Sequence, residues 1–187
     1  MPPVGRTRLR PRTMKATLPF VNFHTHHPAH EGELSLGGEE HGFDTRWDKP
    51  LDIQEQEFAR AVEESEHKQT FLTIHCVKSI DTVLRMRRTL KPSQPWLFHG
   101  FRGKPQQLRS LVEAGLFVSF GFRYNVQSLL LCPLERMCLE TDDNPGPIRP
   151  LYEEVSRLRG VTLESLQTSM VANMHKLMQK DPATILL

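Results

Sequence analysis

The sequence predicts an α/β fold in which a parallel sheet is covered by helices, in the manner of a TIM-like (β/α) barrel. Two observations predict this fold. Short runs of apolar residues alternate with segments of helical periodicity along the 187-residue chain, and the runs are apolar at successive positions, as in strands that are buried on both faces. A third observation concerns function, because four of the runs end next to a residue that can bind a metal ion.

The predicted strands are short and rich in β-branched and aromatic residues. They cover residues 20–23, 70–74, 96–98, 116–120 and 137–139, with a weaker signal at 34–36. The remainder of the segment 28–49 is rich in Gly, His and acidic residues, and we interpret it as a loop that carries function.

Helices are predicted between these strands from apolar residues at helical spacing and from capping signals. Asp52 and Glu55 resemble a capping box that begins the first helix, and Ser79 is placed to cap the second, which stops before Pro92. The predicted helices cover residues 52–68, 79–90, 106–113, 147–159 and 162–178.

Composition places the chain among ordinary single-domain proteins. The net charge is +2 and 25% of the residues are charged, so charge alone neither supports nor excludes a nucleic-acid partner. No apolar run is long enough for a membrane helix, and an odd number of cysteines, three, favours a reducing, cytoplasmic location. We expect a disordered basic extension over 1–19, a single domain over 20–180 and a C-terminal tail over 181–187.

The first candidate ligands are His24 and His26, which follow the first predicted strand. Side chains two residues apart lie on the same side of an extended strand, so both imidazoles can bind one ion. A His-x-His pair also occurs often by chance, and the pair alone is therefore weak evidence.

Later strands end in the same way, at His75, at His99 and at the carboxylates of Glu140 and Asp142. A single histidine of this kind is more often a packed or loop residue than a ligand. The carboxyl ends of parallel strands meet at one face, however, so these residues are expected to converge there. Cys76 follows His75 and is interpreted as a packing thiol rather than a ligand.

In this order, the motifs resemble the TatD-type metal-dependent deoxyribonucleases, a family of amidohydrolase-like TIM barrels. The resemblance extends from about residue 20 to residue 178. It is carried by the following pieces: His24-Thr25-His26, Glu40-His41-Gly42-Phe43-Asp44, Gln54 to Phe58, Ile74-His75-Cys76, His99-Gly100-Phe101-Arg102-Gly103, Val118-Ser119-Phe120-Gly121, Glu140-Thr141-Asp142 and Asn173.

The resemblance implies a centre of one or two divalent ions, whether Mg, Mn, Zn or Ni. By resemblance, His24 and His26 hold one ion, His75 and His99 hold the second, Glu40 bridges both, and Asp142 completes the site and assists the attacking water. Glu40 and Asp142 are then the catalytic carboxylates, and Glu140 supports a neighbouring ligand from the second shell. The implied reaction is hydrolysis of phosphodiester bonds in DNA.

Three basic residues beyond the predicted strands, Arg102, Lys104 and Arg123, are candidates to bind substrate phosphate, although a solvated surface role is at least as common for such residues. Two alternatives stay open. One is a related metal hydrolase of a small-molecule ester, amide or phosphate, and the other is a degenerate barrel without activity.

One departure from the family pattern concerns the frame of the fold. Only 13 residues separate His26 from Glu40, where the family carries a strand, a helix and a further strand, and a βαβ unit needs about 30 residues. The chain is therefore expected to lack about one strand-helix unit. The barrel would be seven-stranded, open, or completed by another subunit in a homo-oligomer.

Overall fold

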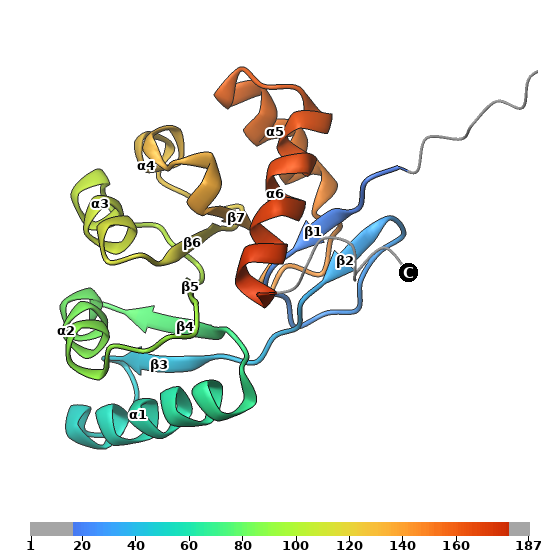
Figure 1. Ribbon diagram of the computed structural model, residues 1–187. Helices are drawn as coiled ribbons and strands as arrows, with labels where there is room; N and C mark the ends of the chain where they lie inside the picture. The colour runs from blue at the N-terminus through green and yellow to red at the C-terminus, as the bar shows by residue number, and fades with distance from the viewer. Residues whose placement is uncertain (1–16, 180–187) are drawn as a thin grey trace, which may run out of the picture.

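The computed structural model describes residues 17–179, which form an α/β fold of parallel strands with helices on the outside (Figure 1). The strands are β1 (Phe20–Asn22), β2 (Glu33–Ser35), β3 (His41–Asp44), β4 (Leu72–Val77), β5 (Trp96–Phe98), β6 (Phe117–Phe120) and β7 (Met137–Leu139). The helices are α1 (Leu51–Lys68), α2 (Ile80–Leu90), α3 (Pro105–Glu113), α4 (Val126–Leu131), α5 (Arg149–Arg159) and α6 (Leu163–Met178), with a 3-10 turn, η1 (Leu134–Arg136). Most of the predicted basic extension and all of the predicted C-terminal tail lie outside the described residues.

All strand pairs are parallel, and they form a five-stranded sheet in the order β3-β4-β5-β6-β7 and a separate pair, β1-β2. The chain just after β1 joins the two sheets. The Phe23 N–H donates to the carbonyl of Leu139 at 3.0 Å, and Thr25 forms a parallel bridge with Asp142. The strand order is therefore β2-β1-β7-β6-β5-β4-β3, with the carboxyl ends of the strands on one face.

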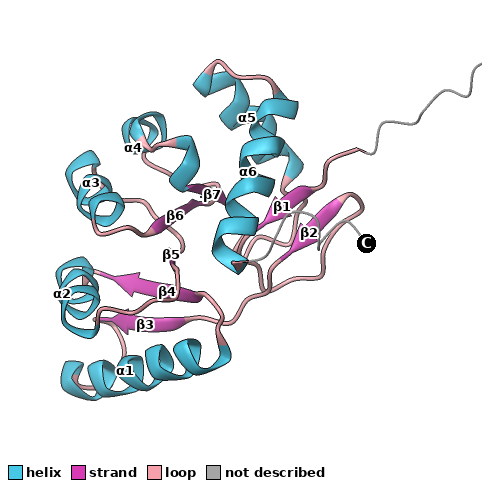
Figure 2. Ribbon diagram, viewed as in Figure 1, coloured by secondary structure: helices cyan, strands magenta, loops and turns pink. Residues whose placement is uncertain are grey.

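The barrel is open between β2 and β3. Residues 36–40 connect these two strands without a helix (Figure 2), and no ladder joins the two strands within residues 17–179. Because a right-handed crossover needs a helix or a comparable length of chain, two neighbouring parallel strands cannot be formed by so short a link. Instead, the segment pairs first with β1 and then with β4. The shortage that the sequence predicts is confirmed, and it produces an open seven-stranded arrangement.

The interior is apolar and continuous beneath the helices. Trp96, Leu97 and Phe98 are all buried, as the predicted central strand requires, and Tyr152 packs on the other side of the core with its hydroxyl donating to the Val21 carbonyl at 2.8 Å. Strands predicted from unbroken apolar runs are confirmed because helices cover one face of each and the core covers the other.

Two elements are missing from the sequence prediction. The segment 41–44 was expected in a loop but forms β3, because Gly42 lets it approach β4 closely. A Cβ atom at Gly42 would lie only 1.9 Å from the carbonyl oxygen of His75. The second is α4, a helix of six residues that begins where the Asn125 side chain accepts from the N–H of Ser128. It is too short for its periodicity to be recognised.

The predicted caps of α1 and α2 are also corrected. Helix α1 begins at Leu51 after Pro50, whose fixed φ suits a helix start, and no side chain caps it, so the capping box at Asp52 is wrong. Ser79 does precede α2, but its hydroxyl donates to the Val77 carbonyl and does not cap the helix.

Gln54 of α1 covers part of the open edge of β3. Its side-chain oxygen accepts from the Asp44 N–H at 3.0 Å, and its amide nitrogen donates to the carbonyls of Asp44, at 3.2 Å, and of Lys49, at 2.8 Å. The side chain therefore occupies the backbone positions at which a further strand would bind, and it is buried, at 3% exposure. Capping an open edge in this way opposes pairing with other chains.

Replacing Gln54 by Met, which has a similar size, is expected to lower the free energy of unfolding by about 2–4 kcal/mol, because buried backbone groups lose their partners. Urea denaturation measures this change. Gln56→Met, at an exposed position of the same helix, is the matched control and should stay within about 0.5 kcal/mol of the parent. Equal stabilities of the two variants would contradict the role given to Gln54.

Candidate metal centre

The carboxylate of Glu40 lies at the centre of three imidazoles from three different strand ends. Its Oε2 atom is 3.4 Å from Nε2 of His24 and 3.5 Å from Nδ1 of His75, and it lies closer still to Nε2 of His99. Glu40 itself comes from the link between β2 and β3. The structure therefore brings together one carboxylate and three histidines that are up to 75 positions apart in the sequence.

Asp142 forms the second half of the cluster. Its Oδ1 atom lies 3.7 Å from Nε2 of His24 and 3.7 Å from Nε2 of His26. His24, His26 and Asp142 form one set whose atoms are close enough to share an ion, and His24, Glu40 and His99 form another. All six predicted ligands thus lie in one cluster, with His24 between its two halves.

The burial of His24 tests whether a metal ion fits. This side chain is completely buried, and neither ring nitrogen has a hydrogen-bond partner. Oε2 of Glu40 is likewise buried without a hydrogen-bond partner. Buried polar atoms are normally satisfied, and imidazole nitrogens that face carboxylate oxygens are a donor set suited to a divalent cation. The residues fit such an ion.

Local backbone geometry explains how β1 and β7 present their ligands. The Asp142 N–H donates to the His24 carbonyl at 3.0 Å, and the His26 N–H donates to the Asp142 carbonyl at 3.2 Å. Asp142 adopts a left-handed conformation with φ of 54°, which is uncommon outside Gly and Asn and is typical of functional sites. Gly38 completes the arrangement, because a Cβ there would lie 2.5 Å from the Thr25 carbonyl oxygen.

Glu140 contacts His99, and together with His99 and Asp142 it forms a third group with metal-binding spacing. Its Oε1 atom is 3.5 Å from Nδ1 of His99 and accepts from the Gly100 N–H at 2.6 Å. The carboxylate is fully buried. This position matches the supporting role predicted for Glu140, which stays a prediction.

The charges of the cluster are strongly coupled. Burial opposes ionisation of Glu40, but the neighbouring imidazoles of His24, His75 and His99 outweigh it and hold the pKa of Glu40 far below its usual range. The nearby Glu40 carboxylate raises the pKa of His75. Burial lowers the pKa of His99, yet its contacts with Glu140 and Glu40 prevail and raise it to about 10. The cluster thus favours a bound positive charge, which a proton or a metal ion can supply.

Sequence reasoning assigned no role to three neighbours of His75. Asp44 lies with Oδ2 3.2 Å from Nε2 of His75, and Arg46 binds the same carboxylate. The Trp47 indole stacks on the His75 ring, with centroids 5.5 Å apart and planes within 8°. Their only signal in the sequence was position, since they follow Glu40 within seven residues.

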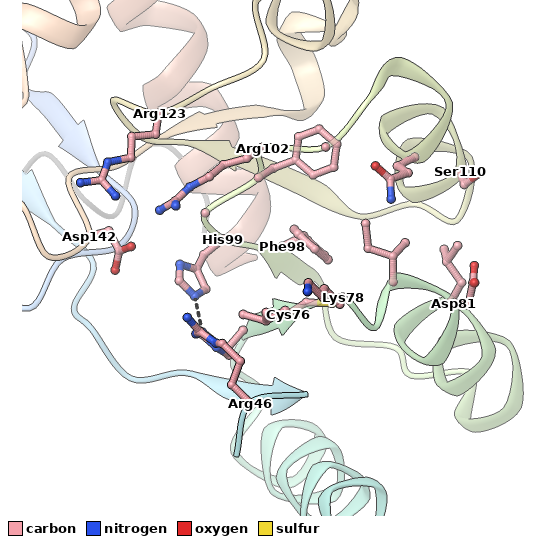
Figure 3. A pocket seen from close by; sticks show the side chains of 18 of the residues that line it. Arg46, Cys76, Lys78, Asp81, Phe98, His99, Arg102, Ser110, Arg123 and Asp142 are labelled. Carbon is pink, nitrogen blue, oxygen red and sulfur yellow. Dashed lines mark hydrogen bonds between the residues drawn. The ribbon is translucent and has the colours of Figure 1, made fainter. Parts of the chain in front are cut away.

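A cavity of about 1060 Å³ opens beside the cluster and is shown in Figure 3. His75, His99 and Asp142 reach it from the cluster, and Arg102 and Arg123 extend toward Asp142. Four basic side chains line it: Arg46, Lys78, Arg102 and Arg123. Two of the three residues predicted to bind phosphate therefore line this cavity, and their role stays a prediction.

Two other predicted residues have different surroundings. Lys104 is exposed at the start of α3 and does not line this cavity, although Gly103 before it and Gln106 after it do. Cys76 lines the cavity, and burial raises the pKa of its thiol to about 11. Within residues 17–179 it belongs to no group with metal-binding spacing.

Membrane insertion has no support in the described part of the chain. None of the helices between residues 17 and 179 combines the length and the apolar character that crossing a bilayer requires.

Comparison with solved structures identifies the fold class as that of TatD-type hydrolase barrels. A TatD homologue from Escherichia coli K12 is similar with a TM-score of 0.69 and 17% identity, covering 76% of this chain and 63% of that protein. A TatD-family hydrolase from Entamoeba histolytica is similar with a TM-score of 0.66 and 12% identity, covering 75% of this chain and 62% of that protein. An uncharacterized amidohydrolase from Saccharomyces cerevisiae is similar with a TM-score of 0.62 and 13% identity, covering 76% of this chain and 64% of that protein.

The family model of TatD-related DNases matches residues 30–179. The chain belongs to this family. It spans somewhat less than two thirds of the length of the structures that it resembles, in agreement with the short link between β2 and β3. No match was found among curated proteins.

Proposed function

We propose that the protein is a metal-dependent hydrolase of phosphodiester bonds, acting on DNA. The observation that carries this proposal is the buried His24, whose two ring nitrogens have no hydrogen-bond partner while carboxylates of Glu40 and Asp142 face it. One or two divalent ions would satisfy these nitrogens and carboxylates together, and membership of the TatD-related family supports the same function.

The proposed ligands divide into two sets that share the central carboxylate. His24, His26 and Asp142 would hold one ion, His75 and His99 would hold the other, and Glu40 would be shared between them. Divalent ions in such a centre polarise a phosphoryl oxygen and make water a stronger nucleophile near neutral pH.

The chain's own groups complete the reaction. Asp142 is partly exposed toward the cavity, so its carboxylate can accept the proton that the attacking water loses. Arg102 and Arg123 reach the same side of the cavity and bind the phosphate oxygens, which orients the scissile ester. Glu140 holds His99 in place through Nδ1.

The test is hydrolysis of a short single-stranded DNA and of bis(p-nitrophenyl) phosphate by full-length protein, before and after treatment with a chelator. We expect both substrates to be cleaved, activity to disappear on chelation, and activity to return when Mn²⁺ or Zn²⁺ is added. A protein that binds no divalent ion, or whose turnover is unaffected by the chelator, contradicts the proposal.

The cavity volume gives a specific reason to keep a second substrate class. About 1060 Å³ is at the upper end of the range for small-molecule pockets, so a small-molecule ester or phosphate would also fit. Hydrolysis of generic carboxylic esters without hydrolysis of DNA would favour that function. A folded, ion-binding protein that cleaves neither would favour the degenerate, non-catalytic barrel.

Location and assembly belong to the same proposal. The three cysteines are all unpaired, which supports a reducing, cytoplasmic setting. Gln54 caps only the Asp44 end of the β3 edge, so the rest of the gap between β2 and β3 stays open to a second copy in a homo-oligomer. Size-exclusion chromatography with light scattering tests this.

A further inference from the structure

Asp44, the last residue of β3, is a buried carboxylate that contacts the candidate centre through another residue. Its exposure is 2%. Oδ2 lies 3.2 Å from Nε2 of His75. The opposite ring nitrogen of His75, Nδ1, faces Oε2 of Glu40 at 3.5 Å and Nε2 of His99 at 3.2 Å. One nitrogen of the ring is thus directed toward the cluster, and the other toward Asp44.

The same arrangement occurs on the neighbouring strand with the ring nitrogens exchanged. His99 faces the cluster through Nε2, and its Nδ1 lies 3.5 Å from the buried Glu140. A carboxylate behind a ligating histidine fixes the tautomer and the orientation of the ring. Each of these histidines therefore has its own buried carboxylate.

Arg46 connects Asp44 to the cavity. Its backbone N–H donates to Oδ1 of Asp44 at 2.8 Å, Nε donates to Oδ1 at 2.9 Å, and Nη2 donates to Oδ2 at 2.5 Å. The side chain is 69% exposed and lines the cavity. Among the described residues, Nη1 makes no hydrogen bond, so one end of the guanidinium is free for an anion.

The position of Asp44 does not depend on the ion or the substrate. Gln54 holds its backbone N–H and carbonyl, and the hydrogen bonds of Arg46 hold its carboxylate. A carboxylate fixed on both sides gives a preorganised orientation to the groups that bind it.

We propose that Asp44 is a positioning residue, which orients His75 to bind an ion through Nδ1 and holds Arg46 so that its free N–H groups bind a substrate phosphate. This inference rests on the proposed function. It adds that the Asp44 carboxylate positions both the ion proposed on His75 and His99 and a phosphate next to the scissile bond.

The experiment is calorimetric titration of the metal-stripped, full-length protein with Zn²⁺, for the parent and for Asp44→Asn. We expect two binding events in the parent. In Asp44→Asn, the affinity of the ion held by His75 and His99 should fall by about 10- to 100-fold, while the other ion keeps its affinity. Asp48→Asn, an exposed carboxylate in the same loop, is the matched control and should bind both ions like the parent.

Arg46→Gln tests the second part of the inference. Because Arg46 contacts substrate directly and the ion only through Asp44, KM for single-stranded DNA should rise about tenfold while kcat stays near that of the parent and the Zn²⁺ affinity falls less than in Asp44→Asn. The double variant carries both Asp44→Asn and Arg46→Gln. Its KM should be no higher than that of Asp44→Asn alone, since Arg46 depends on Asp44 for its orientation.

A nitrogen-15 NMR spectrum of the Zn²⁺-loaded parent gives a readout without any substitution, should Asp44→Asn fail to fold. We expect the ion on Nδ1 of His75 and on Nε2 of His99. Coordination of His75 through Nε2, or unchanged Zn²⁺ binding in a folded Asp44→Asn, overturns the inference and leaves the proposed function intact. A parent that binds no Zn²⁺ overturns both.

Discussion

Replacing Glu40 by Gln is expected to reduce phosphodiester hydrolysis by about 10³-fold or more, because both ions lose their shared ligand. The substitution keeps the size of the side chain and removes its charge. Three imidazoles, those of His24, His75 and His99, then face one another without the carboxylate that lies between them. Binding two dications with Asp142 as the one remaining carboxylate among the proposed ligands is unfavourable in a partly buried site, so we expect the bound metal to fall below one ion per chain.

Metal content by mass spectrometry and kcat for bis(p-nitrophenyl) phosphate measure these two effects. Glu39→Gln is the matched control, because this neighbouring carboxylate is 88% exposed and contacts only His41, at 3.6 Å. The control should keep two ions and the activity of the parent. If Glu40→Gln retains both ions and most of its turnover, Glu40 does not bridge the centre.

Asp142→Asn is expected to lower kcat by about 10²- to 10⁴-fold, the usual contribution of a general base. The amide can still occupy the position of the carboxylate but cannot accept a proton from water. Asn also tolerates the left-handed conformation that Asp142 adopts at φ of 54°, so the thermal unfolding temperature should change little. Asp142→Ala removes activity as well, with an added loss of stability from backbone strain.

The measurement is single-turnover hydrolysis at saturating Mn²⁺, which compensates for weaker binding of the ion. Asp143→Asn, an exposed carboxylate at the next position, is the control. Turnover by Asp142→Asn close to that of the parent would show that another group accepts the proton. Taken with retained turnover by His99→Ala, it would remove the basis of the site assignment.

Sequence alone determined most of the strand and helix frame and the convergence of the ligands. Trp96, Leu97 and Phe98 form an unbroken apolar run, and such a run is stable only where it is buried on both faces. Once parallel strands were inferred, His75 and His99 had to meet at one face because parallel strands place their carboxyl ends together. The 13-residue spacing between His26 and Glu40 also indicated a missing strand-helix unit, once it was compared with the pattern of the family that the sequence resembles.

Only the tertiary structure decided the identity of β3 and the surroundings of His75. The segment 41–44 has little apolar pattern, and it becomes a strand because Gly42 fits against the backbone of β4. Asp44 and Arg46 look like an ordinary loop pair in the sequence. Their contacts with His75 and with the cavity depend on pairing between segments about 30 residues apart. Local sequence sets the propensity of a segment, whereas such contacts form only when the whole sheet does.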